Sequence, residues 1–228
     1  MNNRIVLDIE TAGMPFEAIE PAIQEYLLRY AQTEDEVAAE KQKTGLYPYT
    51  AEIVCIGMLN PDTNRGQVLV SAPPGSPPWC NEEGTIEFFP HTERSMLERF
   101  WEIVSRYDQI ITFNGRGFDA PFLHIRSAIL GVKCTRNLMP PRFDASQHID
   151  MLEELTFHGA SRKFSLDIVC IGFGIDSPKR HGVVGLEIAE MHRAGRYREI
   201  AEYNVLDLLA TKELWERWVS TQPPKSGK

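Results

Sequence analysis

Strand-like and helix-like segments follow one another along this chain, with strands concentrated in the first half and helices in the second. Apolar runs predict strands at residues 4–10, 52–59, 67–71, 85–89, 109–113 and 143–149. Apolar residues at helical spacing predict helices at 16–44, 92–104, 118–130, 165–172, 184–194 and 197–219. Such a chain must bury a sheet against helices, so we expect an α/β fold with a mixed central β-sheet flanked by helices.

The length of 228 residues predicts one domain. We expect this domain to cover residues 1–219, with a helical insertion at about 16–44 and a Pro-rich loop at about 72–84. Residues 220–228 contain two prolines and a Ser-Gly pair, so we expect a flexible tail there.

The net charge of −8 argues against a passive nucleic-acid binder, which usually presents a basic face, but it is compatible with an enzyme whose acidic side chains hold cations. No apolar run approaches the ~18 residues of a membrane-spanning helix, and the N-terminus lacks a signal-peptide core. We therefore expect a cytoplasmic protein that does not enter a membrane. The four cysteines are scattered without a C-x-x-C pair, so we expect neither a disulfide nor a zinc site.

Two carboxylates lie near the end of the first predicted strand. Asp8 and Glu10 are two residues apart, so their side chains point to the same face of the strand. Two carboxylates that face one way repel each other unless a cation lies between them. Considered alone, the pair is explained more simply by a solvated strand end.

Two further acidic positions have a distinctive context. Asp119 follows the strand at 109–113 and opens an apolar helix, where it is either a helix cap or a site residue. Tyr203 and Asp207 are four residues apart in the predicted C-terminal helix, which places them one turn apart on one face. Packing of Tyr203 and pairing of Asp207 with a base are the structural alternatives.

The three motifs together resemble those of a known group of enzymes. Asp-x-Glu, Asn-x-x-x-Phe-Asp and Tyr-x-x-x-Asp occur in that order, and the pattern resembles the DEDD superfamily of 3′–5′ exonucleases, which have a ribonuclease H-like fold. The segment 113–119, Phe-Asn-Gly-Arg-Gly-Phe-Asp, is similar to the second exonuclease motif of family-B DNA polymerase proofreading domains. The resemblance runs from Ile5 to about Trp215, although only the three motifs are specific.

The resemblance implies a set of site residues. Asp8, Glu10, Asp119 and Asp207 would be the four metal-binding carboxylates. Tyr203 stands four residues before the last aspartate, and Glu202 occupies the position of the histidine found in the other branch. The chain is therefore similar to the tyrosine (DEDDy) branch, in which Tyr203 would join the four carboxylates in catalysis.

The resemblance also implies an activity. We expect two divalent cations, Mg²⁺ or Mn²⁺, because both ions prefer oxygen ligands and a pair of them can stabilise the attacking and leaving oxygens of a phosphodiester. The expected reaction is metal-dependent 3′–5′ exonuclease hydrolysis at the 3′ ends of single-stranded DNA or RNA, which releases nucleoside 5′-monophosphates. Tyr203 would position the attacking water.

Several residues close to the motifs are candidate substrate contacts. Thr11, Asn114, Arg116 and Phe118 are the four expected substrate-binding residues. A turn residue at Asn114, core packing of Phe118 and a solvated charge at Arg116 are the structural alternatives. Lys163, Lys179 and Arg180 are further candidates for phosphate contacts. Asp150 is explained most simply as a helix cap.

Two other functions remain open at this point. A catalytically idle nucleic-acid-binding or scaffold module would keep the same fold without turnover. An enzyme that acts on small nucleotides would keep the metal site but prefer mononucleotides. The choice between DNA and RNA and the identity of protein partners do not follow from the residues.

Overall fold

The structure is a computed structural model that describes residues 3–177 and 187–223. A seven-stranded mixed sheet forms its centre. Its strands are β1 (Arg4–Gly13), β2 (Ala51–Asn60), β3 (Arg65–Ser71), β4 (Trp79–Cys80), β5 (Ile86–His91), β6 (Gln109–Thr112) and β7 (His148–Asp150). The spatial order is β4-β5-β3-β2-β1-β6-β7, with β1 antiparallel to β2 and parallel to β6. This arrangement confirms the expected α/β fold with a mixed sheet.

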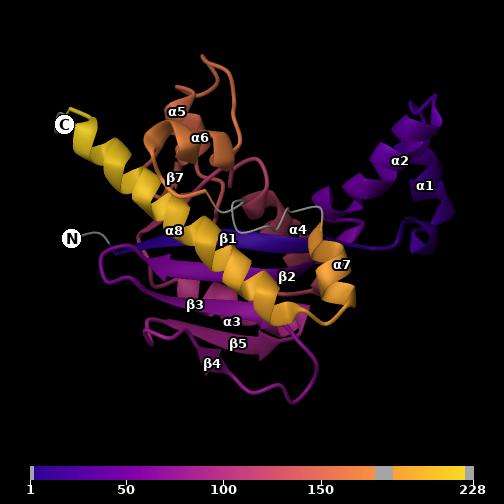
Figure 1. Cartoon of the computed structure of the whole chain (residues 1–228), viewed down its shortest axis with the longest axis horizontal. Helices are drawn as coiled ribbons and strands as arrows, with labels where there is room; N and C mark the ends of the chain where they lie inside the picture. The colour runs from indigo at the N-terminus through magenta and orange to yellow at the C-terminus, as the bar shows by residue number, and fades with distance from the viewer. Residues whose placement is uncertain (1–2, 178–186, 224–228) are drawn as a thin grey trace.

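Helices cover both faces of the sheet (Figure 1). They are α1 (Pro21–Leu28), α2 (Glu34–Gln42), α3 (Glu93–Val104), α4 (Asp119–Leu130), α5 (Met151–Leu155), α6 (Leu166–Phe173), α7 (Ile188–Arg193) and α8 (Tyr197–Thr221). Short 3₁₀ helices occur at Phe16–Ala18 and Lys43–Leu46. The long α8 crosses one face of the sheet diagonally, while α3 and α4 pack behind the other face (Figure 1).

The side chains of β1 alternate between two separate apolar clusters. Ile5, Leu7 and Ile9 pack with side chains of α3 and α4. Val6 faces the opposite way and packs in the cluster that contains the apolar residues of α8. Because side chains alternate along a strand, Asp8 and Glu10 share the face of Val6 and lie beneath α8.

One edge of the first strand is paired with another strand along only part of its length. β1 pairs with β6 through Arg4–Val6, opposite Gln109–Ile111. β6 ends at Thr112, whereas β1 continues to Gly13 and stays paired with β2. The register with β2 shifts between Glu10 and Thr11. The parallel edge of β1 is thereby open to other groups from about Ile9 onward.

The segment between β1 and β2 contains α1 and α2, which extend from the body of the protein (Figure 1). Every residue of these two helices is at least partly exposed. A capping box, in which Thr33 and Glu36 bond each other's backbone N–H groups, begins α2. The segment 16–44, predicted to be helical, contains two α-helices with a 3₁₀ helix on either side, and its role as an insertion stays a prediction.

Some predicted elements differ from the structure. The predicted strand at 143–149 is wrong over most of its length, because only His148–Asp150 pairs, with β6. The five-residue α5, too short to show helical periodicity, was not predicted. The Pro-rich loop contains the two-residue β4, whose Trp79 ring stacks on Phe88. α8 continues past the start of the predicted tail, to Thr221. Positions 184–186 and 224–228 of the predicted last helices and tail lie outside the described residues.

Among the described residues, none of the helices combines the length and the apolar character that a membrane crossing requires. All four cysteines are free thiols, and Cys55 and Cys170 are buried as their apolar surroundings indicate.

Candidate active site

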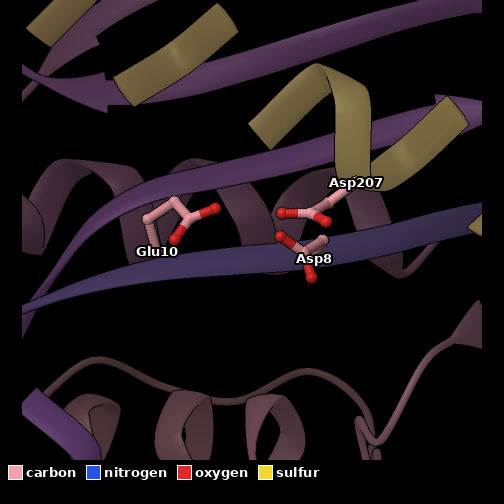
Figure 2. A group of neighbouring side chains, drawn as sticks. All are labelled: Asp8, Glu10 and Asp207. Carbon is pink, nitrogen blue, oxygen red and sulfur yellow. The ribbon is translucent and has the colours of Figure 1, made fainter. Parts of the chain in front are cut away.

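Three carboxylates from the two ends of the chain meet on the α8 face of the sheet. Each of Asp8, Glu10 and Asp207 contributes an oxygen, and these oxygens all lie within 4.8 Å of one another. Figure 2 shows the Asp207 carboxylate reaching down from α8 toward Asp8, with Glu10 farther along the same strand. The structure therefore brings the first and third sequence motifs together.

Asp119 reaches the same group from the open edge of β1. It is the first residue of α4 and is only 3% exposed. Its Oδ1 accepts a hydrogen bond of 3.0 Å from the backbone N–H of Ile9, the residue between the two strand carboxylates. This N–H is available because β6 ends before it, and the charge of Asp119 acts on both Asp8 and Glu10.

The loop before α4 is held by a fifth carboxylate. Oδ1 and Oδ2 of Asp150 accept hydrogen bonds of 2.9 Å from the backbone N–H groups of Asn114 and Arg116, respectively. Asp150 also accepts from the N–H of Leu152 at the start of α5, which confirms its predicted role as a helix cap. Asn114 has a φ of 61°, in the left-handed region that asparagine tolerates better than most residues. This geometry places Asp119 at the start of α4.

Burial and crowding make the charged state of this group costly. Burial, reinforced by the neighbouring carboxylates, holds the pKa of Asp8 and of Glu10 well above the ordinary range. Burial likewise raises the pKa of Asp119 to about 7, although the hydrogen bond from Ile9 opposes the shift. A cation between these carboxylates would relieve both the repulsion and the loss of hydration.

Tyr203 lies one turn before Asp207 and is 8% exposed. Burial, followed by the charge of Asp207, raises the pKa of the Tyr203 phenol above its usual range. A side-chain hydrogen bond joins the phenol to Asp207. Tyr203 is therefore a neutral hydroxyl beside the carboxylates, which can donate and accept hydrogen bonds but is a poor proton-abstracting base.

Asn204 is the residue of this site that the sequence reasoning missed. Its side chain is fully buried, and its Nδ2 donates a hydrogen bond of 2.7 Å to Oδ2 of Asp8. Gly57 of β2 stands opposite Asp8, and a Cβ at that glycine would lie 1.8 Å from Oδ1 of Asn204. A glycine inside an apolar strand and a polar residue on the buried stripe of a helix were the available signals.

The expected substrate-binding residues already have structural partners. The Thr11 hydroxyl donates to the carbonyl of Gly45 at 2.7 Å. The Phe118 ring lies 5.2 Å from the Phe122 ring and packs against the α3–α4 cluster. Their expected contacts with substrate stay predictions.

Arg116 is largely enclosed. Its side chain is 10% exposed and lies 3.6 Å from Glu153, and its Nη2 donates to the carbonyl of Pro140 at 2.6 Å. Together with Asn114 and Lys163 it lines a pocket of about 320 Å³ beside the loop. Lys179 and Arg180 lie outside the described residues.

The donor set fits hard divalent cations. The four clustered side chains offer only carboxylate oxygens, which are the ligands that Mg²⁺ and Mn²⁺ prefer. Their burial and mutual repulsion, described above, give a cation a favourable place to bind.

Comparisons with known proteins agree with this geometry. DNA polymerase 1 of Aeropyrum pernix is 29% identical over 147 residues, which cover 58% of this chain and 14% of the polymerase. The structure of the family B DNA polymerase from Pyrobaculum calidifontis matches with a TM-score of 0.60 at 18% identity, over 96% of this chain and 25% of that polymerase. The structural likeness confirms the expected ribonuclease H-like fold, and the chain spans only a small part of either polymerase.

A family described as predicted 3′-5′ exonucleases related to the exonuclease domain of PolB matches residues 84–223, which is more than half of the chain. This match includes Asp119, Tyr203 and Asp207, while the partner carboxylates of β1 precede it. The protein therefore belongs to this family of predicted 3′-5′ exonucleases related to the exonuclease domain of PolB, as its motifs indicated.

Proposed function

We propose that this protein is a metal-dependent 3′–5′ exonuclease that removes nucleoside 5′-monophosphates from the 3′ ends of single-stranded DNA or RNA. The observation that carries the proposal is the cluster of Asp8, Glu10 and Asp207, with the buried Asp119 bonded to the backbone between the first two. Burial raises the pKa values of Asp8, Glu10 and Asp119, so their charged forms are costly, and cation binding is the function that this arrangement serves best.

The residues of the site would have distinct roles in the reaction. Two Mg²⁺ or Mn²⁺ ions, held by the four carboxylates, would supply Lewis acidity and a water of lowered pKa. Tyr203, neutral at working pH, would orient the attacking water through its hydroxyl. The backbone N–H of Ile9 would keep Asp119 turned toward the strand carboxylates.

The burial of the site supports a single-stranded substrate. Glu10 is 7% exposed and Asp119 is 3% exposed. A single strand is narrower than a duplex and would reach such groups more readily. Selection between DNA and RNA would depend on contacts with the 2′-hydroxyl.

An assay of oligonucleotide degradation in Mg²⁺ or Mn²⁺ tests the proposal. The oligonucleotides carry a label at the 5′ end only. We expect a ladder of shortened products, and Asp207→Asn should reduce the rate by about 10³-fold, since metal stabilisation contributes several kcal/mol. Glu202→Gln is the matched control, because it removes one negative charge from an exposed position of the same helix. Full activity of Asp207→Asn would refute the assigned role.

Two controls separate the alternatives. An idle scaffold without metal affinity would show no rise in melting temperature on addition of Mn²⁺, whereas the proposed enzyme should be stabilised. An enzyme for small nucleotides would act faster on mononucleotides than on oligonucleotides. Neither alternative accounts as directly for a family match to 3′-5′ exonucleases combined with four clustered acids.

The proposal includes two broader expectations. Residues 1–219 would form the exonuclease-like domain, with the segment at 16–44 as an insertion. The free state of all four cysteines supports a reducing compartment such as the cytoplasm.

A further inference from the structure

A neutral amide is packed among the acids of the site. Asn204 precedes Asp207 by about one helical turn and is fully buried. Its Nδ2 donates to Oδ2 of Asp8 at 2.7 Å, and a side-chain hydrogen bond from Asn204 lowers the pKa of Glu10. One NH₂ group therefore serves both carboxylates of β1.

The orientation of this amide follows from its surroundings. With the amide rotated, its oxygen would face the carboxylate of Asp8, and two acceptors would repel each other. In the observed orientation Oδ1 lies over Gly57 and is buried without a hydrogen-bond partner among the described residues. Burying an unpaired amide oxygen is costly, so the bonds that Nδ2 makes to the carboxylates must hold the side chain in place.

Gly57 makes this arrangement sterically possible. It is paired with Asp8 in the β1–β2 register, directly beneath the amide. A Cβ there would lie 1.8 Å from Oδ1 of Asn204 and 2.7 Å from Cδ1 of Leu208. The glycine thus allows α8 to approach β2 closely enough for Asn204 to reach the strand carboxylates.

We propose that Asn204 is a positioning residue that holds Asp8 and Glu10 in the orientation required for cation binding. This inference rests on the proposed function, because it assigns the two carboxylates to the metal site. Asn204 donates hydrogen bonds where the carboxylates would otherwise only repel one another, so the metal-free site keeps the arrangement that the ions need. Neighbours that orient metal ligands in this way typically change metal affinity by about 10–100-fold.

Binding of Mn²⁺, measured by calorimetry without nucleic acid, tests the proposal. Asn204→Leu keeps the branched shape but removes the donor, and Asn204→Ala removes the donor and leaves a cavity. We expect both variants to bind Mn²⁺ about 10–100-fold more weakly than the unmodified protein. Thr211→Ala is the control, because Thr211 is a buried polar residue of the same helix, two turns farther on, and should leave Mn²⁺ affinity unchanged.

The outcomes distinguish a donor from a packing residue. Equal weakening in both Asn204 variants, at unchanged Thr211→Ala affinity, supports the proposal. Normal affinity in Asn204→Leu overturns it, whether or not Asn204→Ala is impaired, since packing would then explain the site. High Mn²⁺ should restore the oligonucleotide degradation rate of Asn204→Leu.

The same measurements separate this proposal from the function on which it rests. If the unmodified protein binds Mn²⁺ but degrades no oligonucleotide, the exonuclease assignment fails while the role of Asn204 is still decided by the affinities. If the unmodified protein binds no Mn²⁺, both proposals are overturned.

Discussion

The two faces of the central sheet differ in the partners of their polar side chains. On the α3–α4 face, Arg126 donates from Nε and Nη2 to the two carboxylate oxygens of Glu93, and the Trp101 indole donates to Ser127 at 2.8 Å. On the α8 face, Asp8 and Asp207 face each other as like charges. The buried charges of the α3–α4 face are paired with opposite charges, whereas the carboxylates of the candidate site lie beside other carboxylates.

This difference also divides stability from function. The α3–α4 face contains fully buried aromatic residues such as Phe100 and Trp101, and its buried charges are compensated. On the α8 face, β1 presents the apolar Val6 and then the acidic Asp8 and Glu10. We expect substitutions on the α3–α4 face mainly to lower the free energy of unfolding. Substitutions of the acidic side chains should mainly lower activity.

The largest expected effect is on the α3–α4 face. Phe100→Ala should lower the free energy of unfolding by about 3–5 kcal/mol, because it leaves a cavity in a close-packed cluster. Urea unfolding in the absence of metal measures this loss. Under conditions in which the variant is folded, its Mn²⁺ requirement should match that of the unmodified protein. A changed Mn²⁺ requirement would contradict the proposal that the α3–α4 face contributes to stability and not to metal binding.

A smaller effect is expected where α8 approaches β2. Gly57→Ala should cost about 1–3 kcal/mol, because its Cβ would overlap Asn204 and Leu208. Thermal unfolding measures the cost, and Gly172→Ala is a control, since a Cβ at that glycine meets no atom within 4 Å. Equal stability of the two variants would show that α8 can move away from the sheet without loss.

The hydroxyl of Tyr203 should contribute more to turnover than to stability. Tyr203→Phe keeps the ring and removes the hydroxyl, so we expect kcat to fall about tenfold, as for the loss of one hydrogen bond in the reaction, with KM nearly unchanged. Steady-state kinetics on an oligonucleotide measures both constants. An equal rise in KM would instead indicate that the hydroxyl binds substrate.

The last expected effect is a pH dependence of the metal-free protein. Burial raises the pKa of Asp119 to about 7 in the folded state, against about 3.9 in an unfolded chain. The folded state then binds more protons between these values, so the contribution of this carboxyl to stability is present below pH ~4 and is lost as the pH rises through ~7.

Melting temperatures in EDTA measure this effect through a matched variant. Asp119→Asn keeps an acceptor for the N–H of Ile9 and cannot ionise. The unmodified protein should therefore lose stability relative to Asp119→Asn between pH 4 and 7, because its folded state binds more protons than the unfolded chain over this range. Saturating Mn²⁺ should reverse the loss. A constant difference between the two proteins across this range would contradict the raised pKa.

The sequence was most informative where local periodicity determines direction. The i, i+2 spacing of Asp8 and Glu10 predicted a shared face, and the i, i+4 spacing of Tyr203 and Asp207 predicted one helix face, and the structure has both arrangements. The order of the three motifs then pointed to a fold that brings them together. These features depend on the strand and helix repeats, which a single sequence displays.

Other features depend on how distant segments meet. The role of Asn204 requires α8 to cross β2 at Gly57, and no local pattern encodes that crossing. The strand predicted at 143–149 failed because the pairing of β7 is determined by the adjacent β6 rather than by its own apolar pattern. The extension of β1 to Gly13 likewise reflects its pairing with β2.

The hydrogen bond between Asp8 and Asn204 joins residues that are 196 positions apart. During synthesis, β1 leaves the ribosome long before α8, so a growing chain has two of the acids but not Asp207 or the amide that aligns them. The candidate site can then be assembled only after nearly the whole polypeptide has left the ribosome, because the two distant segments must meet before these contacts form. The proposed activity would therefore be absent from nascent chains until folding is complete.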